Sequence, residues 1–210
     1  MFTEEHEQVA DFGAGEGVFA LSLSGEVHRA LRVEADSVFR SLLMGRGLET
    51  ISQLESTPNT SVGCLYSFNV SEHIADDGAT LQLWYSKLCD RGRLLLYVPA
   101  LPVLYTSLDR PSAQYRRYRL RSTRARLLAA GLRADSAEYV DSLGFVAAMA
   151  HKLIDDGSGT INQRAVRVYD RYVFRISRTL NHLLHSWLGK NLLVAAHKPY
   201  DPQLAGYFCP

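Results

Sequence analysis

Three glycines at alternate positions follow a short apolar run near the start of the chain, in the stretch VADFGAGEG at residues 9–17. Residues 8–12 are typical of a buried strand and residues 18–23 of a helix, so the glycines occupy the turn between them. Missing side chains at such a turn let the backbone touch a ligand, and the first amides of the helix supply hydrogen-bond donors. The pattern indicates a nucleotide-type site, although a glycine-rich turn can also be only a tight connection.

The spacing of the glycines narrows the kind of ligand. A dinucleotide fingerprint, G-x-G-x-x-G, requires a glycine where this chain has Val18, and no Gly-Lys-Ser/Thr follows to make a P-loop. The observed order is D-x-G-x-G-x-G, from Asp11 to Gly17. Glu34 ends the next predicted strand, where a carboxylate can accept both ribose hydroxyls of a nucleoside or can simply lie on the surface beside a turn. The two features in this order favour a nucleoside site.

Apolar and polar stretches alternate along the rest of the chain at lengths typical of strand–helix–strand units. The predicted strands are residues 8–12, 30–34, 62–68, 93–98, 134–140 and 191–197, and the predicted helices are residues 18–23, 37–44, 77–89, 122–130 and 163–187. The 210 residues show no repeat, linker or low-complexity tract, so a single domain is expected. This alternation predicts an α/β fold with a mostly parallel sheet.

Charge and cysteine content argue against several classes of partner. The formal net charge of +1 gives no global reason to expect a nucleic acid. The three cysteines lie far apart and contain no CxxC pair, so no metal site is expected.

The N-terminal residues are acidic and lack the order of a signal peptide. The longest apolar run, residues 94–105, is too short to span a membrane. We therefore expect a soluble, cytoplasmic protein.

Several stretches, taken in order, resemble segments of class I S-adenosylmethionine-dependent methyltransferases of the type 11 and type 23 kind. YSFNVSEHIADD (66–77) resembles S-x-N-V-L-E-H-I-x-D-D, and QYRRY (114–118) resembles G-H-Y-R-R-Y. The segments LCDRGRLLLYVPALPVLYTSLD (88–109), YVDSLGF (139–145) and GKNLLVAAHKP (189–199) extend the resemblance over nearly the whole chain. It implies a Rossmann-like, mostly parallel seven-stranded sheet with helices on both faces. Residues 1–210 would form one methyltransferase domain, with helical substrate-side insertions at about 99–130 and 142–188.

The resemblance also implies S-adenosylmethionine as the cofactor and assigns residues to it. The glycines would meet the methionine part, Glu34 the ribose and Glu49 the adenine, while Asn69 and Val70 would form the floor below the sulfonium. The full set of implied cofactor-binding residues is Asp11, Gly13, Ala14, Gly15, Gly17, Glu34, Ala35, Glu49, Asn69 and Val70.

The chain departs from the family pattern at several positions. The departures are Ala14 for a cysteine, Ser71 for a leucine, Gly63 for an aspartate, Gln114 for a histidine, and a single glycine, Gly92, in place of a Pro-Gly-Gly turn. The helix that covers the cofactor in the family has no room before residue 9, so we expect it to be short or absent. The alternatives are a truncated start, a more open pocket, or cover by a homodimer partner or another chain.

Methyl transfer is an in-line displacement, so the protein mainly positions the acceptor and removes a proton where needed. His73 follows the fourth strand of the resemblance and is the candidate base, although a histidine here can also cap the next helix. The implied substrate contacts are Gln114, Tyr115, Arg116, Arg117 and Tyr118. Arginines there suit a carboxylate or phosphate on the acceptor.

These features lead to an expected function with alternatives. The expected function is S-adenosylmethionine-dependent methylation of a small molecule such as a glycan, lipid or secondary-metabolite intermediate. A catalytically degenerate binding or interaction module is the alternative. The arginine-rich stretch at 116–126 also allows an RNA methyltransferase, although a solvated helix face explains it equally well. Residues 163–187 are interpreted as a lid over the substrate side, in preference to a membrane-binding or subunit-binding surface.

Overall fold

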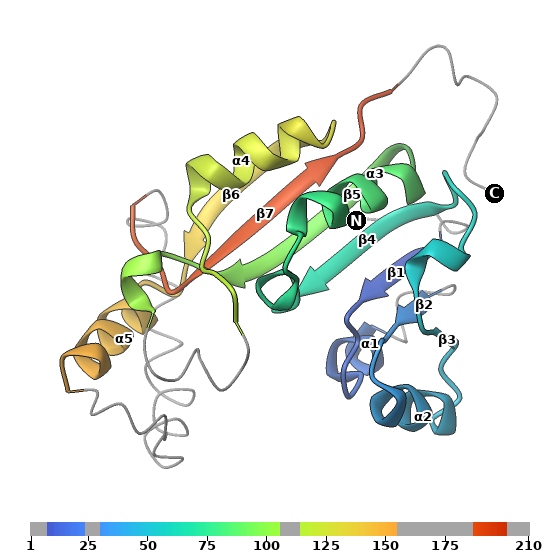
Figure 1. Ribbon diagram of the computed structural model, residues 1–210, viewed down its shortest axis with the longest axis horizontal. Helices are drawn as coiled ribbons and strands as arrows, with labels where there is room; N and C mark the ends of the chain where they lie inside the picture. The colour runs from blue at the N-terminus through green and yellow to red at the C-terminus, as the bar shows by residue number, and fades with distance from the viewer. Residues whose placement is uncertain (1–7, 24–29, 106–113, 155–186, 201–210) are drawn as a thin grey trace.

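The computed structural model describes residues 8–23, 30–105, 114–154 and 187–200 (Figure 1). The predicted helix at 163–187 lies outside the described residues except for Trp187. The segment before the first strand, where the cofactor-covering helix of the resemblance would lie, is outside them as well. The described residues are organised around one sheet, whose topology decides where the glycine turn lies.

Seven strands form this sheet in the order β3-β2-β1-β4-β5-β7-β6. Their bounds are β1 Val9–Phe12, β2 Ala30–Val33, β3 Thr50–Ile51, β4 Val62–Phe68, β5 Leu88–Pro99, β6 Arg133–Val140 and β7 Asn191–His197. β1 to β5 pair in parallel, whereas β7 runs antiparallel to β5 and β6, as Figure 1 shows. The mostly parallel α/β sheet predicted from the alternation of elements is confirmed.

Helices connect the strands and cover the hydrophobic core. They are α1 Val18–Leu23, α2 Ser37–Gly45, α3 Asp77–Lys87, α4 Leu120–Ala129 and α5 Ser142–Ile154, with short 3-10 turns at Leu54–Ser56, Ser71–His73 and Pro102–Leu104. The fully buried Trp84 of α3 and Leu127 of α4 pack against Leu65, Leu94 and Leu192 of the central strands. Burial of such large apolar side chains is the main favourable contribution to folding.

The largest difference from the predicted element boundaries lies between α3 and β5. The predicted helix at 77–89 ends at Lys87, and β5 begins at once, because Leu88 pairs with Val62 of β4. The Asp-Arg-Gly-Arg segment that replaces a Pro-Gly-Gly turn therefore lies inside a long strand. β3 was not predicted, because two residues leave no period for a pattern to detect.

Candidate active site

The glycine turn follows β1 and leads into α1. Gly13, Gly15 and Gly17 all have positive φ angles, of 83°, 53° and 80°, which side chains other than glycine adopt only with strain. A Cβ on Gly13 would overlap the Val70 side chain, and one on Gly17 would lie 2.6 Å from Leu43 Cδ2, whereas one on Gly15 would meet nothing within 4 Å. Packing therefore requires the outer two glycines, and the middle one leaves open space.

Glu34 joins this turn to the end of β2. Its Oε2 accepts a hydrogen bond from the Gly15 amide at 2.7 Å, and its Oε1 accepts one from the Asp36 amide at 2.8 Å. The residue is only 9% exposed, so these bonds hold the carboxylate in one orientation. A carboxylate has about four acceptor positions, so roughly two remain for a ligand.

A cavity of about 540 Å³, here called the larger cavity, lies at the carboxyl ends of β1, β2 and β4. Six of the predicted cofactor-binding residues line it, namely Gly13, Gly15, Glu34, Ala35, Asn69 and Val70. The other lining residues are Phe12, Val33, Phe39, Ser52, Gln53, Leu54, Glu55, His73 and Ile74. The carboxyl ends of parallel strands are where α/β folds bind nucleotide ligands.

Four predicted cofactor-binding residues do not line the larger cavity: Asp11, Ala14, Gly17 and Glu49. Glu49 precedes β3, where its backbone carbonyl accepts from the Arg32 amide at 3.0 Å. Residues 52–55, which follow β3, line the larger cavity. Their loop is held by the buried Lys87, whose Nζ donates to the carbonyls of Glu55 and Thr57 and to Asn59 Oδ1. This contact joins residues about thirty positions apart, so no local pattern announces it.

Asp11 lies within the sheet, in register with Arg32 of β2 and Tyr66 of β4. All three side chains are nearly inaccessible. Burial raises the pKa of Asp11 to about 6, against the opposing effects of the Tyr66 hydroxyl and the Arg32 charge. Its place in the structure is therefore a buried polar row of the sheet and not the cavity wall.

A second cavity of about 360 Å³, here called the smaller cavity, adjoins the larger one, because Asn69 and His73 line both. The predicted residues Gln114 and Arg117 also line it. The remaining lining residues, which sequence reasoning missed, are Glu72, Tyr97, Pro99, Lys190 and Asn191. These residue types form no pattern along the chain that predicts a shared cavity. Only Glu72, beside His73 in the quoted motif, lay next to a predicted residue.

Glu72 is the most buried ionisable group in the smaller cavity, with a side chain 1% exposed. Its Oε2 has no hydrogen-bond partner among the described residues. Its Oε1 lies 3.9 Å from His73 Nε2. Burial raises the pKa of Glu72 to about 7, and the nearby charge of Arg117 opposes this rise. A carboxyl group of this kind can exchange a proton near neutral pH.

His73 ends the 3-10 turn that follows β4, and its side chain is 37% exposed. The alternative that it caps the next helix does not hold, because Asp76 caps α3 by accepting from the Ala79 amide at 2.9 Å. Because His73 lines both cavities, it lies at the boundary between them.

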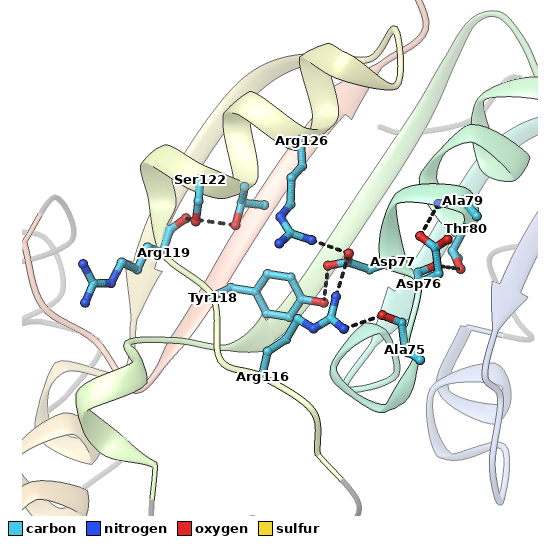
Figure 2. A network of polar contacts seen from close by, with 11 residues as sticks. Ala75, Asp76, Asp77, Ala79, Thr80, Arg116, Tyr118, Arg119, Ser122 and Arg126 are labelled. Carbon is cyan, nitrogen blue, oxygen red and sulfur yellow. Dashed lines mark hydrogen bonds and ion pairs between the residues drawn. The ribbon is translucent and has the colours of Figure 1, made fainter.

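The QYRRY segment divides into two sets of residues. Arg116 and Tyr118 contact Asp77 at the start of α3, as Figure 2 shows, and neither lines the smaller cavity. Tyr115 is 62% exposed and does not line the cavity. Only Gln114 and Arg117 of the five predicted substrate contacts are lining residues. The motif thus supplies two residues to the cavity, while Arg116 and Tyr118 attach the segment to α3.

Two further properties concern the described part of the chain. No helix there has the length and apolar character that crossing a bilayer requires. Within the same residues, no cluster of three or more His, Cys, Asp or Glu side chains could hold a metal ion.

No protein-family model and no curated protein matches the sequence. Solved structures do match. The complex of the Haloferax volcanii Trm112 methyltransferase activator with its methyltransferase matches with a TM-score of 0.66 and 18% identity, over 95% of this chain and 86% of that chain. An Archaeoglobus fulgidus SAM-dependent methyltransferase matches with a TM-score of 0.64 and 16% identity, over 94% and 88%. The cyclase SpnF matches with a TM-score of 0.63 and 16% identity, over 93% and 75%. The chain therefore has the Rossmann-like fold of class I methyltransferases.

Proposed function

We propose that this protein is a S-adenosylmethionine-dependent methyltransferase that acts on a small-molecule acceptor. One observation carries the proposal: the glycine turn and Glu34 line a cavity that adjoins a second, polar cavity at Asn69 and His73. A methyltransferase needs this arrangement of two sites, because cofactor and acceptor must meet end to end.

Each part of the larger cavity suits one part of the proposed cofactor. The open space above Gly15 suits the methionine portion, and the remaining acceptor positions of Glu34 suit the ribose hydroxyls. Residues 52–55, with Phe39 opposite, offer a mixed polar and apolar wall for adenine. When bound, the cofactor would supply an electrophilic methyl group.

The chain's own residues would bind and orient the acceptor in the smaller cavity. Arg117 and Lys190 bring positive charge, which suits an anionic group on the acceptor. His73 at the shared boundary is a candidate base, as predicted from its position after β4. Catalysis would therefore rest on positioning and proton removal within one continuous site.

A binding module without methyl transfer is the second candidate. The matched structure of a cyclase, SpnF, shows that this fold is found in a protein named for another activity. An RNA substrate is less well supported, because Arg116 and Arg126 of the arginine-rich stretch pair with Asp77. With Arg117, which donates to the Ala100 carbonyl, at least three of its six arginines are engaged within the protein.

We also propose that a second chain covers the proposed cofactor site, together with the apolar side chains exposed on α1 and α2 beside it. Val18, Val38 and Met44 there are 64%, 73% and 60% exposed. The Haloferax volcanii match was solved with an activator bound, and a homodimer partner would serve as well. Light scattering tests the homodimer: a mass above the 23.5 kDa of one chain supports it, and a monomer contradicts it.

Calorimetric titration with S-adenosylhomocysteine tests the proposed cofactor. Binding is expected, and ligand at ~100 times its dissociation constant should stabilise the fold by about 2.7 kcal/mol. Absence of both heat and thermal shift would overturn the proposal. Binding without turnover on any small-molecule acceptor would favour the binding module. The cytoplasmic location is part of the same proposal, and fractionation of producing cells tests it.

A further inference from the structure

Two side-chain oxygens at the smaller cavity are buried and have no hydrogen-bond partner among the described residues. They are Glu72 Oε2 and Gln114 Oε1. Buried polar atoms are nearly always paired in folded proteins, so two such atoms in one cavity call for a ligand that pairs with them. The backbone places the two residues close together, because the Tyr115 amide donates to the Glu72 carbonyl at 2.8 Å.

Both oxygens are acceptors, so the ligand group that satisfies them must donate. A single hydroxyl has one proton to give, whereas a primary ammonium group has three. An ammonium group can therefore reach Glu72 and Gln114 together and also complement the negative charge of the Glu72 carboxylate. A backbone carbonyl is neutral, so it offers the ammonium group no comparable charge partner.

Positive charge also lines this cavity, with Arg117 near Glu72 and Lys190 farther along the wall. Arg117 and Lys190 both line it, and the Arg117 guanidinium donates to the Ala100 carbonyl at 3.3 Å, which fixes its direction. Lys190 is exposed at the rim, next to Asn191 at the start of β7. A molecule that places its ammonium group against Glu72 could present an anionic group at its other end to Lys190.

We propose that the smaller cavity binds a primary amine that also carries a carboxylate or phosphate group, and that Glu72 removes the proton that must leave the amine before methyl transfer. This inference rests on the proposed methyltransferase function and names the acceptor class of the same site. The bound ammonium loses one proton to Glu72 Oε2. The amine nitrogen then forms a bond to the methyl carbon while the carbon–sulfur bond breaks, and its electron pair stays on sulfur.

Glu72 is suited to this role by its surroundings. Its elevated pKa of about 7 makes it a usable proton acceptor near neutrality. The charged and titratable groups that face it are His73, Arg117 and Tyr118. His73 is the most exposed of these groups close to it, so it offers the proton a route to solvent.

Binding of a matched probe series tests the acceptor class. The probes are ω-amino carboxylates of two to six carbons, the corresponding aminoalkyl phosphates, the ω-hydroxy carboxylates, and the n-alkylamines without an anionic group. Titrations are run with and without S-adenosylhomocysteine. At least one amino carboxylate or phosphate should bind tenfold or more tightly than its hydroxy and alkylamine counterparts. Comparing carboxylates with phosphates identifies the anionic group.

Substitutions assign the two ends of the probe. Glu72→Gln should weaken the amino acid probe tenfold or more, and Lys190→Met should weaken it without affecting the alkylamine. Glu138→Gln on β6 and Arg124→Met on α4, which lie outside both cavities, are the matched controls. With S-adenosylmethionine, turnover by the parent should rise through pH 7, and Glu72→Gln should lose this rise.

The outcomes separate this inference from the proposed function. Equal binding of all probes, or no probe binding while S-adenosylhomocysteine binds, would overturn the amine-binding site alone. Failure of S-adenosylhomocysteine to bind would instead overturn the proposed function. If Glu72→Gln does not fold, the probe series on the parent protein still decides the acceptor class.

Discussion

The carboxylate of Asp77, at the first residue of α3, lies 2.7 Å from the Arg116 guanidinium. The same carboxylate accepts from the Tyr118 hydroxyl at 3.1 Å and pairs with Arg126 of α4 (Figure 2). Asp77 is 7% exposed at its side chain, and the arginines are 25% and 46% exposed. The pairs attach the segment that carries Gln114 and Arg117 to two helices of the domain.

Asp77→Asn should destabilise the protein and loosen this segment. The expected loss in the free energy of unfolding is about 2 kcal/mol. Hydrogen bonds to the buried carboxylate contribute most of it, because solvent screens the more exposed ion pairs. Urea unfolding measures it. Asp76→Asn keeps a capping side chain and should cost well under 1 kcal/mol. Equal stability of Asp77→Asn and the parent would show that the network holds nothing in place.

Glu34→Gln and Glu49→Gln separate the two predicted cofactor carboxylates. Glu34→Gln should weaken S-adenosylhomocysteine about 10- to 100-fold, as expected for loss of a charge-assisted hydrogen bond of about 1.5–3 kcal/mol. Glu49→Gln should bind like the parent, because Glu49 does not line the larger cavity. Calorimetric titration measures both. Weak binding by the Glu49 variant would return that residue to the adenine site.

Gly13→Ala and Gly15→Ala should fail for different reasons. The first combines a positive φ with overlap against Val70, so a loss of stability of about 2 kcal/mol or more is expected. The second meets open space, so only the φ strain of about 1–2 kcal/mol applies, but its methyl group enters the larger cavity. Thermal unfolding with and without S-adenosylhomocysteine distinguishes them. A folded Gly15→Ala protein with parental affinity would contradict the placement of the ligand.

Asp11 should make the protein less stable as pH rises from 4 to 7. Its folded pKa of about 6 exceeds the ordinary value of 3.8, so in this window the folded state binds more protons than the unfolded state. Stability then falls with rising pH, by at most about 3 kcal/mol for this shift. The free energy of unfolding of Asp11→Asn, relative to that of the parent, should therefore rise by that amount between pH 4 and 7. Unfolding measurements across this range test it. A constant difference between the two proteins would contradict the assignment.

His73→Ala should lower turnover while S-adenosylhomocysteine affinity stays within about twofold of the parent. The reason is that the imidazole lies at the boundary between the cavities beside Glu72, whereas the glycine turn and Glu34 line the proposed cofactor site. Steady-state kinetics with an accepted amine measures the effect. Normal turnover would leave His73 as a surface residue of the 3-10 turn.

Local patterns were sufficient for much of the scaffold. β4 and β7 have the bounds predicted for them, 62–68 and 191–197, and α1 has its predicted bounds as well. Short-range physics decides such features, because apolar runs favour strands and an alternate-glycine turn demands positive φ. The same reasoning located Glu34, whose carboxylate bonds to the turn.

Tertiary structure decided what the scaffold surrounds. Glu72 is buried whereas its neighbour His73 is exposed, and the distant Tyr115 bonds to the Glu72 backbone. Lys190 joins them in one cavity only because β7 inserts between β5 and β6. Arg116 and Tyr118 were predicted from the motif to contact the acceptor, but they pair with Asp77 instead. The sequence by itself determined six of the seven strands, the glycine turn and the position of Glu34. Only packing decided which side chains share a cavity, because burial, pKa values and cavity walls arise from groups far apart in sequence.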